Sequence, residues 1–234
     1  MKKLSLKYGI TLTTVALAAM LAGAWLAATY RENDSRAVLL PDQAMTLFPD
    51  PKPLTAFALT DHRNRVFDLS RLKGKWSFLF FGYTHCPDIC PTTLAVLARA
   101  RENIVNNMTR RASAASRATG NTVGAENVQF VFVSVDPNRD TGDILRQYVT
   151  YFHATFLGVT GDDTQIRNLA GQLGAAYQVS IAPGMENYPV NHSAAVFLLD
   201  PQARYHAVFT PPLDAKAISS RFEVVQELEA VNAR

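Results

Sequence analysis

The two cysteines of the chain, Cys86 and Cys90, are separated by three residues. They follow an apolar run at residues 76–81 and precede an apolar-periodic stretch that begins at Thr92. This order predicts a strand, a tight turn that carries two thiols, and then a helix. Two soft sulfur ligands at such a junction can close a disulfide, or they can hold a soft metal such as monovalent copper.

A proline follows each cysteine. The residue before a proline is disfavoured in the α-helical region, so the sequence predicts a turn-like loop with Pro91 as the first helical residue. Cys90 would then cap the helix, whose dipole lowers the pKa of a thiol at that end. Because the loop is short, we expect the sulfurs of both Cys86 and Cys90 to be accessible to solvent.

A third ligand would let such a site hold copper in both oxidation states, and an imidazole is the natural choice. His192 is the candidate, because it lies just before the buried strand predicted at residues 194–199. In a thioredoxin-like topology, the loop that enters this strand faces the loop that starts the first long helix. On these residues alone two alternatives stay open. The cysteines can form a structural or redox disulfide, and the histidine can be an ordinary loop or core residue.

Other candidate groups have weaker support. His85 adjoins Cys86, but it lies on the opposite side of an extended chain, which favours a packing or supporting role. Asp136 ends a buried strand and can either orient a ligand or form the turn before Pro137. Met185 could supply a soft ligand, but it stands alone in a loop that contains Gly and Pro. Nothing near them in the sequence recommends three other histidines as ligands: His62, His153 and His206.

The elements that must position these residues alternate along the chain. Apolar runs predict strands at 56–60, 66–69, 76–81, 128–135, 155–159, 194–199 and 205–209. Apolar periodicity and capping residues predict helices at 91–107, 141–153, 162–173 and 214–230. Strands that alternate with helices and then end in a hairpin and a helix indicate a three-layer α/β domain. A cysteine pair at the start of the first long helix narrows this to a thioredoxin-like fold over residues 54–234.

Two segments have a composition that does not predict core structure. Residues 31–53 contain several prolines and little periodicity, which predicts a linker. Residues 109–126 consist mainly of Ala, Ser, Thr, Arg and Gly, with Val123 as the only large apolar residue. This composition predicts a flexible insertion that the core does not need.

The first 30 residues indicate a membrane anchor. Lys2, Lys3 and Lys7 precede an uncharged run from Tyr8 to Tyr30. A bilayer core takes roughly 20 apolar residues to cross, and lysines before the run place the N-terminus in the cytoplasm. We therefore expect a single-pass anchor in the inner membrane and a domain that faces the periplasm, where disulfides persist. The alternative is a signal peptide cleaved within the Ala-rich end of the run.

The charge of the chain argues against one class of partner. The formal net charge of +3 comes from the N-terminal lysines, and the rest of the chain holds 20 Lys and Arg against 20 Asp and Glu. A nucleic-acid-binding protein needs a basic surface, so we expect no nucleic-acid partner.

Three segments together resemble the Sco/SenC family in their order and spacing. They are residues 81–91 (FGYTHCPDICP), 133–141 (VSVDPNRDT) and 190–193 (VNHS). The resemblance extends from about Pro53 to the C-terminus. The chain departs from the family pattern at Asn191, where the family commonly has Asp, and in the length of the segment 109–126.

The resemblance implies a membrane-anchored, thioredoxin-like copper protein that serves copper delivery to the binuclear copper centre of cytochrome c oxidase. It implies that Cys86, Cys90 and His192 bind copper, as Cu+ or Cu2+. The expected partners are the copper-bearing subunit of the oxidase and other copper chaperones or thiol reductants. A metallochaperone is favoured over an enzyme. The alternative is a thiol–disulfide reductase that uses Cys86 and Cys90 to keep the oxidase copper-site cysteines reduced.

Overall fold

The computed structural model describes residues 20, 38–39, 45–115, 125–180 and 188–232. The chain divides into two compact units, Met1–Ala37 and Val38–Arg234. All elements described below belong to the second unit.

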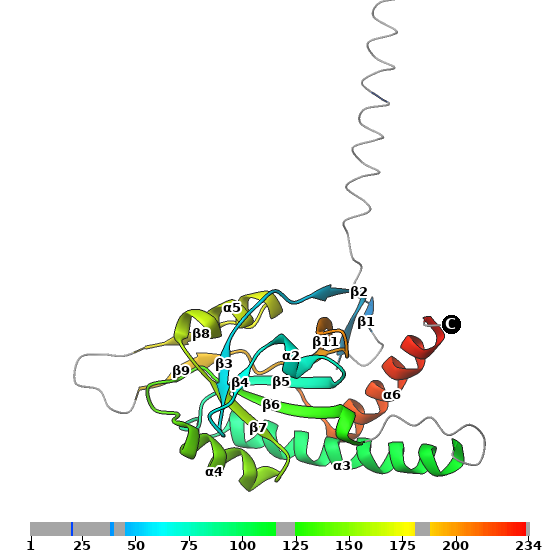
Figure 1. Cartoon of the computed structure of the whole chain (residues 1–234), viewed down its shortest axis with the longest axis horizontal. Coiled ribbons are helices and arrows are strands. Elements are labelled where there is room, and N and C mark those ends of the chain that lie inside the picture. Colours follow the sequence, from blue (N-terminus) through cyan, green and yellow to red (C-terminus); the bar gives the residue numbers. More distant parts are fainter. Residues whose placement is uncertain (1–19, 21–37, 40–44, 116–124, 181–187, 233–234) are drawn as a thin grey trace, which may run out of the picture. The chain divides into compact units, whose positions relative to one another are not determined.

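A nine-stranded mixed sheet forms the centre of this unit (Figure 1). Its strands are β1 (Val38–Leu39), β2 (Met45–Pro53), β3 (Leu59–Asp61), β4 (Val66–Phe67), β5 (Trp76–Gly82), β6 (Val128–Ser134), β7 (Leu157–Thr160), β10 (Val196–Leu199) and β11 (Arg204–Phe209). Their order across the sheet is β1-β2-β11-β10-β5-β6-β7-β3-β4. Strands β5, β6 and β7 are parallel, whereas β10 is antiparallel to β5 and to β11.

Helices cover the sheet on both sides. They are α2 (Leu69–Leu72), α3 (Ile89–Ala115), α4 (Gly142–Phe152), α5 (Asp163–Leu173) and α6 (Ala215–Asn232), with a short 3-10 turn η1 (Ala125–Asn127) before β6. Helices α3 and α4 lie on the opposite side of the sheet from α5 (Figure 1). A separate two-stranded sheet pairs β8 (Tyr177–Val179) with β9 (Val190–His192). The predicted mixed α/β architecture is confirmed.

Aromatic side chains from β5 and its neighbours form the core on the side of α3 and α6. Every residue of β5 is buried. The ring of Phe78 stacks on Phe130 of β6 at 4.6 Å between centroids. Phe222 of α6 packs edge-on against Phe78 at 5.3 Å and against Trp76 at 5.4 Å. Phe222 therefore joins the last helix to the central strand.

The prediction of a linker at residues 31–53 is wrong for residues 38–39, which form β1, and for its last nine residues. Residues 45–53 form β2, which pairs with β11 within the main sheet. Within the described residues, β1 pairs with β2 at Thr46 and Leu47, and no strand pairs on that side with the end of β2 that contains its three prolines. A missing N–H on that side therefore breaks no described ladder.

The prediction of a flexible insertion at residues 109–126 is wrong for residues 109–115, which belong to α3, and for residues 125–126, which belong to η1. Helix α3 continues through Ala115, because Ala and Arg are strong helix formers. The side chain of Arg111 also pairs with Glu223 at 3.3 Å and with Glu227 at 2.9 Å, both on α6. Residues 116–124 lie outside the described residues.

The predicted membrane anchor also falls on residues that the structure does not describe, apart from Met20. Within the described ranges, no helix combines the length and the apolar character that a membrane span requires.

Replacing Phe222 with alanine should lower the free energy of unfolding by about 3–5 kcal/mol, because it leaves a cavity between α6 and the sheet. The matched control on the same helix is Val224→Ala, since Val224 is 45% exposed, and its effect should stay within about 0.5 kcal/mol. Urea denaturation followed by tryptophan fluorescence measures both. Equal effects of the two substitutions would show that α6 is not packed as described.

Candidate metal centre

The loop that carries Cys86 leaves the sheet at the carboxyl end of β5 and is anchored by a buried carboxylate. Asp140 accepts hydrogen bonds from the backbone N–H of Thr84 at 3.0 Å and from its hydroxyl at 2.6 Å. Ser134, the last residue of β6, also donates to Asp140 at 2.6 Å. The Cys86 N–H donates to the carbonyl of Tyr83 at 3.2 Å, which closes the turn.

Cys90 lies inside the first turn of α3 and is fully buried, which corrects the predicted cap, the predicted first helical residue and the predicted accessibility of its sulfur. The helix begins at Ile89, so Cys90 is not its cap and Pro91 is not its first residue. Pro91 is still among the first residues of the helix, where an N–H would have no intrahelical partner. The sulfur of Cys90 is covered because it packs against Gly82, where an added Cβ would lie 2.6 Å away. Cys86 is half-buried, so only this sulfur is partly accessible.

The electrostatics of Cys90 also differ from the sequence-based expectation. Burial raises the pKa of the Cys90 thiol well above its ordinary value, and the nearby Cys86 adds to this rise, while a backbone hydrogen bond from Tyr83 opposes it. The effect of burial on the pKa of Cys90 is thus larger than the lowering expected from the helix dipole. Without a metal, Cys90 is a neutral thiol at pH 7, and a soft cation must displace its proton to bind.

His192 reaches the cysteines from the end of β9. Pairing of Tyr177 with His192 holds this strand against β8. The imidazole lies edge-on to the rings of Phe80 and Tyr83, each at 5.9 Å. Its Nδ1 lies 3.1 Å from the carbonyl of Ser193, which can only accept, so Nδ1 carries the proton. The unprotonated Nε2 then faces Cys90 Sγ at 3.3 Å.

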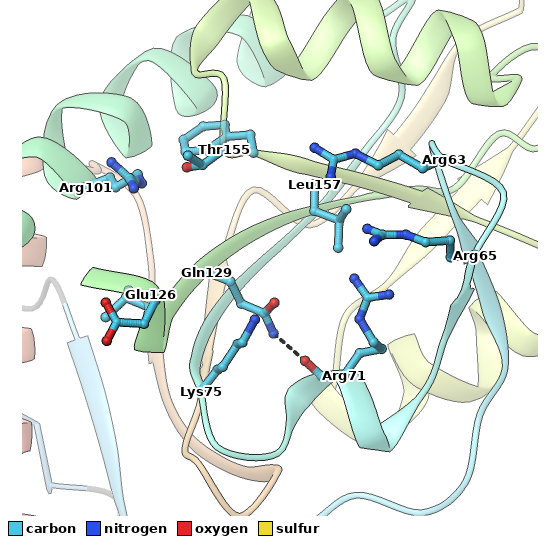
Figure 2. Close-up of a pocket in the computed structure, with 11 residues that line it drawn as sticks. Arg63, Arg65, Arg71, Lys75, Arg101, Glu126, Gln129, Thr155 and Leu157 are labelled. Atoms are coloured by element: carbon cyan, nitrogen blue, oxygen red, sulfur yellow. Dashed lines mark hydrogen bonds between the residues drawn. The ribbon is translucent and has the colours of Figure 1, made fainter. Parts of the chain in front are cut away.

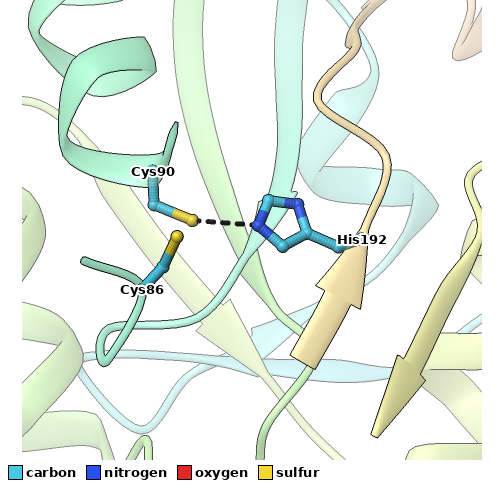
Figure 3. Close-up of side chains that lie close together, drawn as sticks. All are labelled: Cys86, Cys90 and His192. Atoms are coloured by element: carbon cyan, nitrogen blue, oxygen red, sulfur yellow. Dashed lines mark hydrogen bonds between the residues drawn. The ribbon is translucent and has the colours of Figure 1, made fainter. Parts of the chain in front are cut away.

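The three predicted ligand residues come together at one place (Figure 3). The sulfurs of Cys86 and Cys90 and a ring nitrogen of His192 all lie within 4.8 Å of one another. Burial lowers the pKa of His192, partly opposed by backbone hydrogen bonds to Ser193 and Phe81, and this favours the neutral imidazole that binds metals. Two sulfurs and one imidazole nitrogen are a donor set that suits copper.

A buried network supports the segment that leads to His192. Asp136 accepts hydrogen bonds from the Tyr188 hydroxyl at 2.6 Å and from the guanidinium of Arg139. Arg139 also donates to the Tyr188 carbonyl at 3.0 Å and lies over the Tyr188 ring at 3.6 Å. Asp136 therefore acts on the chain that enters β9 rather than on a ligand atom.

The remaining histidines lie outside the cluster. His85 is 3.8 Å from Asp140 and makes contact with Thr84. His62 and His153 accept hydrogen bonds from backbone N–H groups, and His206 packs against Trp76. Met185 falls outside the described residues.

Sequence reasoning missed two residues that hold the cysteine segment in place. Gly82 and Asp140 contact the cysteine segment directly. Gly82 lies within the segment 81–91 and Asp140 within the segment 133–141, so the motifs already contained the residues that could have been identified. Strand β8 had no such signal, because its three residues show no distinctive pattern.

Known proteins share this architecture. A model of the SCO1/SenC family matches residues 49–226. The SCO2-like protein RP587 of Rickettsia prowazekii (strain Madrid E) is 31% identical over 168 residues, which cover 71% of this chain and 74% of that protein. The crystal structure of Arabidopsis thaliana ScoI with copper bound matches with a TM-score of 0.60 at 30% identity, over 75% of this chain and 98% of that chain.

A more distant structure shows the same fold. BsSco matches with a TM-score of 0.51 at 17% identity, over 75% of this chain and 94% of that chain. That protein contains a disulfide switch and is a member of the Sco family of cytochrome c oxidase assembly proteins. These matches confirm the predicted thioredoxin-like fold for the domain, whereas the N-terminal transmembrane helix stays a prediction.

Gly82→Ala should disturb the metal centre without touching a donor atom. The new methyl group would meet Cys90 Sγ at 2.6 Å and Phe132 at 2.8 Å, and such overpacking typically costs about 1–3 kcal/mol. The matched control is Gly171→Ala in α5, which meets nothing within 4 Å and should raise stability by roughly 0.5–1 kcal/mol. Thermal denaturation measures both variants. Similar midpoints would contradict the close packing of Cys90 against β5.

Proposed function

Because the chain belongs to the SCO1/SenC family, we propose that it is a copper-binding protein that delivers copper to the binuclear copper centre of cytochrome c oxidase. The Sco family is one of cytochrome c oxidase assembly proteins. The observation that carries the proposal for this chain is the convergence of Cys86, Cys90 and His192. Copper in the ScoI structure of Arabidopsis thaliana supports the same cargo.

The donor set accounts for both oxidation states of the metal. The two cysteines bind copper as thiolates, which suit the monovalent ion. His192 binds through Nε2, whose lone pair faces Cys90 because Nδ1 donates to Ser193. The imidazole adds the third ligand that helps the site to hold divalent copper.

Unequal burial of the two sulfurs determines the order in which the copper ligands are exchanged. Cys90 is fully buried under the sheet edge, whereas Cys86 is half-buried on the loop. An incoming thiolate from a partner reaches Cys86 first and replaces it as a ligand. Copper then leaves by stepwise exchange of ligands, with Cys90 and His192 released last.

The second candidate function is a thiol–disulfide reductase that keeps the oxidase copper-site cysteines reduced. Both cysteines are free thiols here, and the partly exposed Cys86 lies beside the buried Cys90. A mixed disulfide would form at Cys86 and be resolved by Cys90. This function needs no imidazole, so His192 separates the two candidates.

The proposed location is the inner membrane, with the domain in the periplasm. The support is the run from Tyr8 to Tyr30 behind three lysines. A membrane tether would hold the metal centre near a membrane-bound oxidase.

The reduced protein should bind one copper ion per chain, and Cys86→Ser combined with Cys90→Ser should abolish this binding. Two of the three donor atoms are lost in the double variant, and a serine hydroxyl is a poor ligand for a soft ion. Metal analysis after gel filtration gives the stoichiometry. Full retention of copper by the double variant would place the metal elsewhere.

His192→Ala should weaken divalent copper binding more than monovalent binding and leave thiol oxidation intact. Removing a residue that only orients a ligand typically lowers metal affinity by roughly 10- to 100-fold. The divalent affinity of His192→Ala should fall by more than that. His85→Ala is the matched control, because His85 neighbours Cys86 but lies outside the cluster. Competition with a chelator of known affinity measures both ions. An unchanged divalent affinity would show that His192 is not a ligand.

An impermeant thiol reagent should label Cys86 in intact, mildly reduced spheroplasts of a bacterial host, and the labelled protein should pellet with membranes at full length. The reagent reaches only groups outside the cytoplasm, and Cys86 is the partly exposed thiol. Cys86→Ser serves as the unlabelled control. Labelling only after lysis would show that the domain lies in the cytoplasm. A soluble, shortened product would show that the N-terminal segment is a cleaved signal peptide and not an anchor.

A further inference from the structure

A pocket of about 450 Å³ (Figure 2) lies at the opposite end of β5 from the cysteines. It is built at the amino ends of β5, β6 and β7, beside the turn that joins β3 to β4. Lys75 lines the pocket just before β5, whereas the Cys86 loop follows the same strand. At roughly 3.3 Å per residue, β5 separates this pocket from the metal centre by about 20 Å.

The pocket gathers positive charge in a domain whose formal net charge is zero. Its lining contains five cations: Arg63, Arg65, Arg71, Lys75 and Arg101. One carboxylate, Glu126, lines it as well, and a second, Asp61, is buried beside it. Five cations against these two carboxylates leave an excess of three positive charges, which Glu102 next to Arg101 offsets in part.

Several of these cations are held in place before any ligand arrives. Asp61 accepts hydrogen bonds from the backbone N–H groups of Arg63 and Arg65, at 2.8 and 3.0 Å, which fixes the turn. It also pairs with the side chain of Arg65 at 2.8 Å and with that of Arg71 at 3.6 Å. Gln129 donates to the Arg71 carbonyl at 2.9 Å. Figure 2 shows the guanidinium groups of Arg63, Arg65 and Arg71 gathered on one side of the pocket.

Three cations have no carboxylate within ion-pair distance in the described part of the chain: Arg63, Lys75 and Arg101. Arg63 and Arg101 instead face the ring nitrogens of His62 and His153, each at 3.2 Å. The pKa of each histidine is lowered, chiefly by burial, so the rings are neutral. Burial also lowers the pKa of Arg101, partly opposed by Glu102, so a bound anion would stabilise its charge.

We propose that this pocket binds a phosphate ester, either free in solution or as the headgroup of a lipid. Guanidinium forks match the oxygens of a phosphate in a bidentate manner. The volume is in the range of small-molecule sites, roughly 300–1,000 Å³. Val128, Phe156 and Leu157 supply an apolar wall for the organic part of the ester. A compact phosphate group, whose oxygens all lie on one phosphorus atom, fits this cluster better than the carboxylates of an acidic peptide, which are spaced along a chain.

Isothermal titration calorimetry on the full chain in an uncharged detergent tests the proposal with three probes. Phenyl phosphate represents a free ester, dihexanoyl phosphatidylglycerol represents a lipid headgroup, and tetraglutamate represents an acidic peptide. At least one phosphate probe should bind with one site per chain, and added salt should weaken it. Binding of phenyl phosphate alone, or of the lipid, supports the proposal and identifies the source of the phosphate.

Paired triple variants localise the site. Arg63→Gln, Lys75→Gln and Arg101→Gln together should lower phosphate affinity at least about tenfold, or ~1.4 kcal/mol. Lys52→Gln, Arg99→Gln and Lys216→Gln remove the same charge from exposed positions elsewhere and should leave affinity unchanged. If the pocket triple does not fold, the single variant Arg63→Glu at an exposed turn should show the same loss.

Three results would overturn the proposal: no binding of either phosphate probe, equal weakening by both triple variants, or tighter binding of tetraglutamate than of the phosphates. Copper stoichiometry serves as an independent readout. It should be unchanged in the pocket triple, because the metal centre lies at the other end of β5. A failed phosphate test therefore leaves the copper proposal standing, and a failed copper test leaves the phosphate site standing.

Discussion

The in-register pairing of β5 with its two neighbours is the constraint on which the metal centre depends. Parallel pairing with β6 ends with Gly82 opposite Ser134, so the cysteine loop and the Asp140 loop leave the sheet side by side. Antiparallel pairing places Val196 of β10 opposite Phe80, which returns the preceding segment to the same edge. A slip of one residue would turn every side chain of β5 to the other face. The cysteine segment would then lose its position relative to His192.

Burial then determines the chemical state of the donors. Packing of Cys90 against Gly82 raises the pKa of its thiol, and burial lowers the pKa of His192. Both shifts favour uncharged side chains in the metal-free protein, so the buried donors carry no unpaired charge when no ion is bound. Cys86 stays half-buried on a loop tied to Asp140. One donor is thus open to exchange, while the other two keep a fixed geometry.

The sequence predicts the α/β class, the central strands, and the residues that come together, because apolar periodicity and motif spacing are local signals. It does not predict β2, whose prolines read as a linker until β11 supplies the pairing. It also misplaces the start of α3 by two residues, so that Cys90 is predicted to cap the helix. The accessibility predicted from the short loop is wrong for Cys90 because its sulfur packs against Gly82. The ion pairs of Arg111 with α6 likewise cannot be predicted from the residues around Arg111 in the sequence. What sequence reasoning missed depends on tertiary contacts between distant segments.

X-ray absorption at the copper edge tests the central claim most directly. The full chain is loaded with one equivalent of monovalent copper, and the fine structure counts the sulfur and nitrogen neighbours of the metal. The geometry of the cluster predicts two sulfur neighbours and one imidazole nitrogen, with the nitrogen lost in His192→Ala and one sulfur lost in Cys86→Ser. A spectrum with no sulfur neighbours, or one that does not change in these variants, would contradict copper binding by Cys86, Cys90 and His192.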